Sequence, residues 1–337
     1  MNVAVLGTGA WGTTLAIMLA RRGMNATLWA RTQEEASTLQ ADRQNAYRLP
    51  DYEFPPSLVV TADLEAAMSG ASAIILAVPS NAMRANVKLA QPFVDDAMLI
   101  VSATKGLERG TSKRMSEVMA EELPERSNRR LCVLSGPNLS KEIAEGQPAS
   151  TVVAAYDETV AEQAVAVIME PRFRAYTNTD VVGVELGGAF KNIVAIGAGM
   201  SDGLGYGDSA KAGFITRGLA EITRLGEAAG AKPLTFAGLA CLGDLIATCS
   251  SKLSRNYFVG EQLAKGRPLK SILEGMRNVA EGVDTTVAAL EMASSLGVEM
   301  PIAETTRRVL FDGVEPEAAV RELLTRSPKA EWTGMTR

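Results

Sequence analysis

Residues 3–22 read VAVLGTGAWGTTLAIMLARR, and this stretch decides the fold of the first half of the chain. The apolar run at residues 3–6, which contains β-branched residues, predicts a strand. The helical pattern TTLAIMLARR, which ends at Arg22, predicts a helix. Between them lies GxGxxG, in the context of a dinucleotide-binding turn. Gly7 permits the tight turn, Gly9 lets a pyrophosphate approach the backbone, and Gly12 lets the helix pack closely on the strand. The alternative is a glycine turn that binds no ligand.

The chain after this motif alternates between strand and helix patterns. Further strands are expected at residues 25–30, 73–78, 98–102, 131–134, 151–155 and 173–176. Helices are expected at residues 34–41, 64–68, 82–90, 112–121 and 157–169. Short connections and mostly apolar strands predict an α/β fold with a doubly wound, Rossmann-type parallel sheet that is covered on both faces.

The end of the second predicted strand indicates which dinucleotide is bound. An NAD-specific site usually has an acidic residue about 20 residues after the glycines, whereas this chain has Arg31 there. A guanidinium pairs with a 2′-phosphate, so we expect NADPH, with NADH as the alternative cofactor. The other interpretations place Arg31 on the adenine or in solvent.

Three further segments follow predicted strands, at residues 78–81, 102–106 and 135–140. In doubly wound sheets the ligands bind at the carboxyl ends of the strands. Lys105 is the one cation in these segments, so we expect it to meet a phosphate or a carbonyl group. The alternative is an ordinary lysine on a surface loop.

From residue 181 onward the pattern is helical almost throughout. Helices are expected at residues 183–207, 209–229, 245–249, 256–265, 279–295, 302–311 and 316–325. We therefore expect a dinucleotide-binding domain at residues 1–182 and an all-helical substrate and catalytic domain at residues 183–337.

The first helix of the second domain carries one interior lysine. Residues 183–207 read GVELGGAFKNIVAIGAGMSDGLGYG, and small residues lie one turn before and after Lys191. Each glycine inside a helix lowers helix stability by about 1 kcal/mol relative to alanine. Several of them therefore suggest that space is needed there, either for a ligand at Lys191 or for a neighbouring helix. In the second case Lys191 reaches into solvent. We expect the helix to face the cofactor cleft.

Three later positions also suggest a site. Asp244 and Ser254 stand where helix N-caps are expected. Capping does not explain Arg255 in a first turn, where the helix dipole disfavours cations. Arg255, Asn256 and a helix N-terminus together predict an anion site. Glu281 taken alone is a first-turn carboxylate.

The composition excludes several classes of function. The chain has 337 residues and a net charge of −5, so a broad nucleic-acid surface is not expected. Three cysteines without CxxC argue against a disulfide framework and fit a reducing compartment. Histidine is absent, which removes Ser-His and Cys-His nucleophiles and nearly all zinc sites. The N-terminus enters a strand directly, and we expect no membrane-spanning segment, no metal and a cytoplasmic location.

With these residues in hand, the chain resembles the bacterial NAD(P)-dependent glycerol-3-phosphate dehydrogenases from end to end. The resemblance is carried, in the order of that family, by GTGAWGTTLA, ATKGLE, SGPNLSKEIAEG, GVELGGAFKNIVAIGAGMSDGLG, CLGDLIATC, SRN and VAEG. One departure is Asn138-Leu139-Ser140, where the family more often has Thr or Ser, Phe and Ala. Because of that departure, the resemblance does not specify which contacts this loop makes.

The resemblance implies reversible reduction of dihydroxyacetone phosphate to sn-glycerol 3-phosphate, which supplies glycerophospholipid synthesis. It implies that Lys191 is the general acid/base and that Asp244 orients either Lys191 or a substrate hydroxyl. The implied substrate contacts are Lys105, Gly136, Asn138, Lys191, Asp244, Ser254, Arg255 and Asn256, with the phosphate on Arg255 and Asn256. Besides Gly7 and Gly12 of the turn, the implied dinucleotide contacts are Thr8, Gly9, Trp11, Arg31, Lys105, Ser140, Arg255, Val279 and Glu281. A homodimer is a candidate assembly.

Two other functions fit parts of the sequence. One is a dehydrogenase with the same architecture that acts on a hydroxy acid, whose substrate carries a carboxylate instead of a phosphate. The other is a redox-sensing regulator that binds the dinucleotide without chemistry. Lys105, Lys191, Asp244 and Arg255 together argue against the regulator, because a sensor needs no proton donor.

Overall fold

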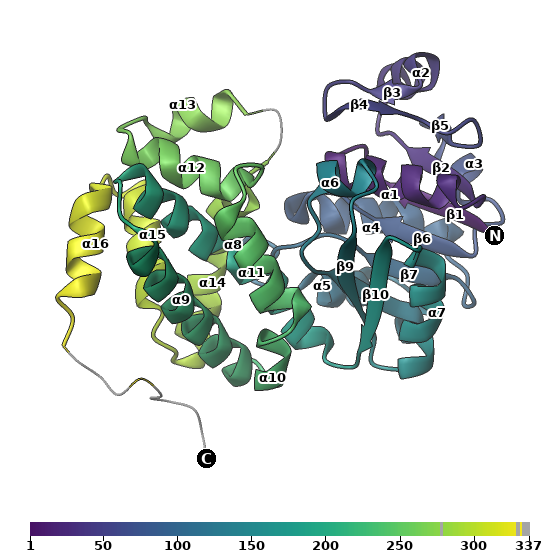
Figure 1. The fold of residues 1–337 in the computed structure, drawn as a ribbon. Coiled ribbons are helices and arrows are strands. Elements are labelled where there is room, and N and C mark those ends of the chain that lie inside the picture. The colour runs from purple at the N-terminus through teal and green to yellow at the C-terminus, as the bar shows by residue number, and fades with distance from the viewer. Residues whose placement is uncertain (277–278, 328–330, 332–337) are drawn as a thin grey trace. The chain divides into compact units, whose positions relative to one another are not determined.

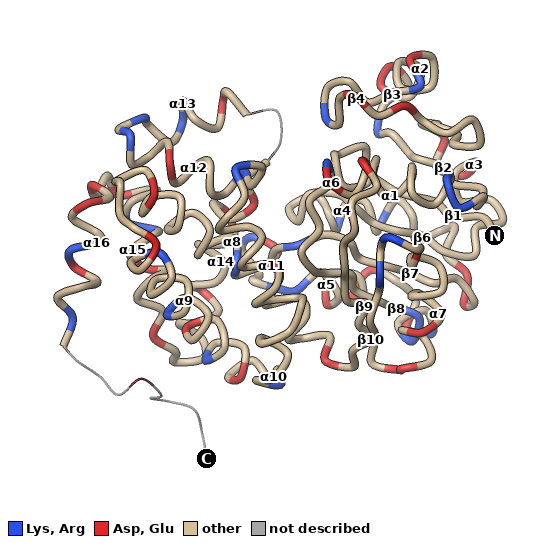
Figure 2. The backbone as a smooth tube through the Cα atoms, in the orientation of Figure 1, with Lys and Arg blue, Asp and Glu red and all other residues tan. Residues whose placement is uncertain are grey.

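The computed structural model describes residues 1–276, 279–327 and 331, which pack into two units (Figure 1). The first unit contains Met1–Glu108 and Lys113–Glu185, and the second contains Arg109–Ser112 and the chain from Leu186 onward. Basic and acidic residues are interspersed along both units (Figure 2).

The first unit is built on one eight-stranded sheet. In spatial order its strands are β10 (Phe173–Asn178), β9 (Ala149–Ala154), β8 (Leu131–Ser135), β7 (Leu99–Ser102), β6 (Ala73–Leu76), β1 (Asn2–Leu6), β2 (Asn25–Trp29) and β5 (Val59–Thr61). Its α-helices are α1 (Ala10–Arg21), α2 (Gln33–Asp42), α3 (Leu64–Met68), α4 (Met83–Ala90), α5 (Met115–Glu122), α6 (Ser140–Ala144) and α7 (Glu158–Ile168). Short 3-10 helices are η1 (Ser80–Ala82), η2 (Gln91–Phe93) and η3 (Glu125–Arg130).

The alternation along β1 shows how both faces of this sheet are covered. Val3 and Val5 belong to an apolar core that includes residues of α1 and α7. Ala4 and Leu6 belong to the opposite core, which includes residues of α3, α4 and α5. All four side chains are fully buried, as expected for a strand with helices on both faces. The predicted doubly wound architecture is confirmed.

The sheet is not parallel throughout, and this corrects the prediction. β8 pairs with β9 in antiparallel register, with Val133 opposite Ala154, whereas the other neighbouring strands are parallel. The connection from β8 to β9 contains only the five-residue helix α6. A parallel connection needs a longer crossover, usually a full helix, so β9 enters the sheet from the carboxyl edge of β8. The 11-residue helix α7 then allows β10 to run parallel to β9.

Three strands in residues 44–61 escaped the prediction. β3 (Gln44–Asn45) and β4 (Leu49–Glu53) form a separate two-stranded sheet, and β5 adds an edge to the main sheet. The first two strands are short, largely polar, and interrupted by Pro50. Such residues carry no strand periodicity, so their pairing depends on the neighbouring structure.

The second unit is helical. Its helices are α8 (Val181–Gly203, which begins in the first unit), α9 (Asp208–Ala228), α10 (Pro233–Phe236), the π-helical η4 (Leu239–Gly243), α11 (Asp244–Ser250), α12 (Arg255–Ala264), α13 (Leu269–Glu274), α14 (Glu281–Leu296), α15 (Pro301–Phe311) and α16 (Pro316–Leu324). The predicted helices are confirmed within a few residues, whereas α10, η4 and α13 were not predicted. One core of this unit joins Ile196 of α8 to Val259, Val283 and Val309.

The glycines of α8 serve close helix packing. A Cβ on Gly199 would lie 2.0 Å from the carbonyl oxygen of Tyr257, and one on Gly260 would lie 1.8 Å from that of Ile196. α8 and α12 therefore approach each other at glycines on both sides, and an alanine at either position would force them apart. The packing interpretation is confirmed for Gly199. The solvent position that accompanied it for Lys191 is wrong, because Lys191 is only 6% exposed.

Two described segments have the length and hydropathy of a membrane span. They are Val181–Gly203 and Pro233–Ser250, each with a mean hydropathy of 1.4. The apolar window of the first is 89% buried inside the protein and that of the second 44%. A buried core helix also meets this criterion, and α8 is such a helix.

A buried carboxylate in the second unit makes its stability depend on pH. Glu221 of α9 is 3% exposed and accepts the N–H groups of Ile302 and Ala303, at 2.9 Å each, at the start of α15. Burial raises the pKa of Glu221 from its ordinary value of 4.5 to about 7, although both N–H groups oppose this. The folded chain therefore binds this proton more tightly than the unfolded chain.

We expect the contribution of Glu221 to the free energy of unfolding to fall by about 3 kcal/mol as the pH rises from about 4.5 to about 7. Glu221→Gln should flatten that part of the stability profile, and Glu274→Gln on the exposed helix α13 should not. Thermal unfolding followed calorimetrically across this pH range measures the effect. Parallel profiles for the wild type and Glu221→Gln would contradict it.

Candidate active site

The glycine turn has the shape that the motif predicts. Gly7 has a φ of +114°, and a Cβ on it would lie 2.6 Å from the carbonyl oxygen of Ala77, so glycine is required there. A Cβ on Gly12 would lie 2.0 Å from the carbonyl oxygen of Gly7. A Cβ on Gly9 would meet no atom within 4 Å, so the space beside its backbone is open. Gly9 is also the N-cap of α1, whose first turn has no acidic residue. These features fit an anion at the start of α1.

Side chains from α2 and the β3–β4 sheet hold this turn in place. Asn45 donates from Nδ2 to the carbonyl oxygen of Thr8 at 2.8 Å and to Thr13 Oγ1 at 2.9 Å. The hydroxyl of Thr8 donates to Glu35 Oε1 at 2.5 Å. Asn45 was not predicted as part of the site, because it lies in strand β3, which has no strand periodicity in the sequence.

Three other predicted dinucleotide residues of the first unit lie on or next to β2, α1 and α6. Trp11 packs edge-on against Phe173, with ring centroids 6.3 Å apart. Arg31 is exposed just after β2. Ser140 is the first residue of α6, and its carbonyl oxygen accepts the hydroxyl of Thr14 of α1 at 3.2 Å. The loop after β8 is thus joined to the helix that follows the glycine turn.

Lys105, Gly136 and Asn138 lie together after β7 and β8. Lys105 Nζ donates to the carbonyl oxygen of Gly136 at 2.9 Å. Asn138 Oδ1 accepts the hydroxyl of Thr151 at 2.9 Å, and its Nδ2 donates to the carbonyl oxygen of Ser150 at 3.2 Å. A Cβ on Gly136 would lie 2.9 Å from Thr151 Cα, so β9 passes directly beside it. The structure therefore brings these three predicted residues to one place.

In the second unit, Lys191 forms a buried polar group with two residues of α11. Its Nζ lies 3.1 Å from Asp244 Oδ1 and donates to Thr248 Oγ1 at 2.6 Å. Thr248 in turn donates to Asp244 Oδ1 at 3.1 Å. Asp244 is 3% exposed, so the ion pair is largely removed from water.

This buried group places Asp244 and Thr248 differently from the prediction. Asp244 was expected to be an N-cap, but α11 begins at Asp244 itself, after the π-helical η4, and its side chain instead pairs with Lys191. Thr248 was missed, although it stands four residues after Asp244, a spacing that places both side chains on one helix face. The sequence therefore held a signal for Thr248.

The cysteines beside Lys191 are not proton carriers. Cys132, Cys241 and Cys249 are buried and free, which confirms that the chain has no disulfide framework. Burial raises the pKa of Cys249 to about 12, and it also raises the pKa of Cys241. Both thiols are therefore protonated at neutral pH.

The start of α12 combines helix capping with links to two other helices. Ser254 caps the helix, as predicted, by accepting the N–H of Tyr257 at 3.2 Å. Asn256 Nδ2 donates to Asn192 Oδ1 at 2.8 Å, and its Oδ1 accepts the N–H of Gly282 at 3.0 Å. Asn256 thus ties α12 to the residue after Lys191 and to the start of α14. Its predicted contact with phosphate remains a prediction.

Arg255 lies beside the predicted dinucleotide residues of the second unit. Its Nη1 donates to the carbonyl oxygen of Val279 at 2.6 Å. Val279 is half exposed, and Glu281 is the first residue of α14, which confirms its position in a first turn. A separate cavity of about 980 Å³, lined by α8, α9, α15 and α16, includes none of the predicted site residues among those described.

Comparisons with known proteins match both halves of the chain to one enzyme family. The family model described as NAD-dependent glycerol-3-phosphate dehydrogenase N-terminus matches residues 2–161, and the corresponding C-terminus model matches residues 180–321. The chain is 53% identical over 334 residues to a glycerol-3-phosphate dehydrogenase (NAD(P)+) of Dehalococcoides mccartyi, covering 99% of this chain and 93% of that one. A protein of the same name from Chlorobium luteolum is 46% identical, over 98% and 99% of the two chains. The crystal structure of glycerol-3-phosphate dehydrogenase from Coxiella burnetii superposes with a TM-score of 0.92 at 37% identity, over 96% of this chain and 99% of that one.

Proposed function

The chain belongs to the family of NAD-dependent glycerol-3-phosphate dehydrogenases, and on this premise we propose that Lys191 is the general acid/base of its reaction. The reaction is the reversible reduction of dihydroxyacetone phosphate to sn-glycerol 3-phosphate, with NADPH as reductant and NADH as the alternative. The buried group of Lys191, Asp244 and Thr248 is the observation that carries the proposal.

Lys191 has the chemistry that carbonyl reduction needs. Its ammonium group donates a proton to the carbonyl oxygen as that oxygen gains negative charge. In the reverse direction the neutral amine removes the hydroxyl proton. Asp244 and Thr248 hold Nζ at one point, at 3.1 and 2.6 Å, and Asp244 stabilises the protonated form. Proton transfer from a positioned group contributes about 10²–10⁴-fold to rate.

The start of α12 supplies the phosphate site. Arg255 offers a planar fork of donors that matches a phosphate, and the free N–H groups of the first turn add a partial positive charge. Ser254 and Asn256 complete this site, and Lys105, Gly136 and Asn138 contact the rest of the substrate. A dianionic substrate accounts for a cation at a helix N-terminus, which otherwise opposes the dipole.

The first unit fits a dinucleotide. The open space at Gly9, the acid-free first turn of α1 and the exposed Arg31 after β2 suit a pyrophosphate and a 2′-phosphate. When bound, the reduced nicotinamide supplies the hydride for the carbonyl carbon. We assign the dinucleotide contacts to Gly7, Thr8, Gly9, Trp11, Gly12, Arg31, Lys105, Ser140, Arg255, Val279 and Glu281.

The domain roles follow from these assignments. We assign dinucleotide binding to residues 1–182, and substrate binding and proton transfer to residues 183–337. We further propose that the enzyme works in the cytoplasm as a homodimer and that its product enters glycerophospholipid synthesis. The free buried cysteines fit a reducing compartment.

A spectrophotometric assay tests the function directly. We expect the chain to oxidise NADPH with dihydroxyacetone phosphate, and to use NADH less well because Arg31 pairs with a 2′-phosphate. Arg31→Gln should narrow the difference between the two reductants. Turnover of small 2-keto or 3-keto acids in place of the phosphorylated triose would favour the hydroxy-acid dehydrogenase. Cofactor binding without oxidation by any triose phosphate would favour the regulator.

A further inference from the structure

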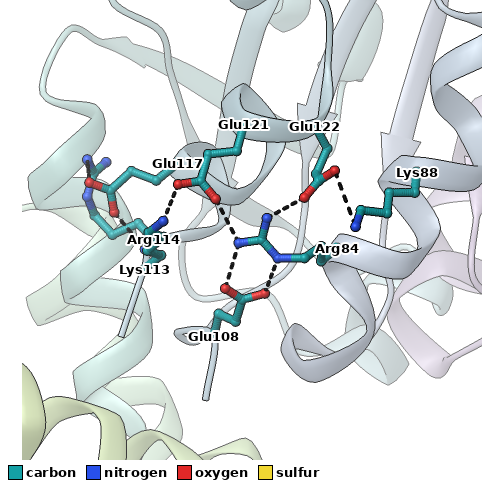
Figure 3. A network of polar contacts seen from close by, with 8 residues as sticks. All are labelled: Arg84, Lys88, Glu108, Lys113, Arg114, Glu117, Glu121 and Glu122. Carbon is teal, nitrogen blue, oxygen red and sulfur yellow. Dashed lines mark hydrogen bonds and ion pairs between the residues drawn. The ribbon is translucent and has the colours of Figure 1, made fainter. Parts of the chain in front are cut away.

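The first unit contains a charged network that the proposed reaction does not use. Arg84 at the start of α4 lies among three carboxylates (Figure 3). It holds Glu108 with two parallel bonds, Nε to Oε1 and Nη2 to Oε2, at 2.8 Å each. Its other contacts are Glu121 at 2.8 Å and Glu122, both on α5. Hydrogen bonds with Glu108, Glu121 and Glu122 raise the pKa of Arg84, so its charge is permanent.

This network is attached to the loop that carries Lys105. The hydroxyl of Thr104, directly before Lys105, donates to the carbonyl oxygen of Val78 at 2.7 Å. Glu108, three residues after Lys105, is the carboxylate that Arg84 holds in two bonds. Val78 and Arg84 belong to one short segment that leads from β6 into α4. Both sides of Lys105 are therefore tied to the same segment, one through a hydroxyl and one through a guanidinium.

The backbone that follows Lys105 is also restrained by contacts with the Arg84 network. Gly106 has a φ of +124°, a backbone conformation that glycine adopts far more readily than other residues do. The next fixed points are an isolated bridge between Leu107 and Arg114 and the bond from Glu108 N to the carbonyl oxygen of Lys113, at 2.9 Å. Lys113 pairs with Glu121, which Arg84 also holds. Arg84 thus restrains both legs of the loop that follows Lys105.

We propose that Arg84 is a positioning residue that sets the location of the Lys105 ammonium group by holding Glu108. This inference rests on the proposed role of Lys105 as a substrate contact. A bidentate arginine–carboxylate pair fixes orientation as well as distance. Small displacements of a substrate-contacting group cost up to about 100-fold in rate.

Glu108 and Glu122 provide a matched pair of variants. Both are held by Arg84, and their side chains are 14% and 16% exposed, but only Glu108 lies on the Lys105 loop. We expect Glu108→Ala and Arg84→Gln to lower kcat/KM for dihydroxyacetone phosphate about tenfold or more. Glu122→Ala should stay within about twofold of the wild type. Arg84→Lys, which keeps the charge but loses the fork, should fall between Arg84→Gln and the wild type.

A double-mutant cycle with Lys105→Met separates positioning from a general loss of stability. If Arg84 acts through Lys105, Arg84→Gln should change kcat/KM little in the Lys105→Met background. Additive losses, or an equal loss for Glu122→Ala, would overturn the inference about Arg84. Lys105→Met with wild-type kcat/KM would instead refute the proposed role of Lys105, and the inference with it. Melting temperatures of all variants show whether any loss follows stability.

Discussion

Replacing Lys191 with alanine is expected to lower kcat by at least about 100-fold while NADPH affinity is kept, because the proposed proton donor is lost. Lys191 is the one lysine that α8 contributes to the buried group with Asp244 and Thr248. Thr248 cannot take its place, because a hydroxyl group is a far weaker acid than an ammonium group. Single-turnover kinetics and fluorescence titration with NADPH measure the two quantities separately.

A second variant protects this test against misfolding. Lys191→Ala leaves the Asp244 carboxylate buried without its charge partner, and breaking a buried pair costs about 3–5 kcal/mol. Lys191→Arg keeps the positive charge, but a guanidinium holds its proton too tightly to act as a general acid. We expect Lys191→Arg to be folded and to lose turnover as well. Lys211→Arg, at a lysine paired with Asp202 in the same unit, is the matched control. Near-normal turnover of a folded Lys191 variant would remove Lys191 from its assigned role.

The second large effect is expected at Arg255. Arg255→Ala should raise the KM for dihydroxyacetone phosphate about 100-fold, equivalent to about 3 kcal/mol of lost binding. The loss is large because a charge-assisted, two-bond contact to a dianion has no neutral substitute. The KM for NADPH should rise as well, but less. Arg255 and Val279 are both proposed dinucleotide contacts, and Arg255 donates to the carbonyl oxygen of Val279. Initial-rate kinetics with each substrate varied in turn gives both constants.

Arg267 is the matched control for this prediction. It follows the C-terminal end of α12, is exposed, and donates to Gln262 at 3.1 Å, so its loss should leave both constants unchanged. Arg255→Lys should give an intermediate KM, since a lysine keeps the charge without the fork. An unchanged KM in Arg255→Ala would refute the phosphate assignment without touching the assignment of Lys191.

Local sequence patterns predicted a large part of the fold. The glycine turn, the strand and helix order of the first unit and most helices of the second follow from hydrophobic periodicity and capping residues. These signals act within one turn or one strand, so they can be read without knowledge of the rest of the chain. The cap at Ser254 is an example, because its hydroxyl bonds to a backbone group three residues later. The strands at residues 44–61 lack such signals and were missed.

What the sequence by itself determined is most of the helices and strands and the residue types that are available for the proposed chemistry. Only the tertiary structure decided that Lys191 is buried against Asp244 and Thr248, that β9 runs antiparallel to β8, and that Arg84 holds the loop of Lys105. Each of these arrangements joins residues that are distant in the chain or depends on how a connection crosses the sheet. No local periodicity encodes such contacts, because they exist only once helices and strands have packed and excluded water between them.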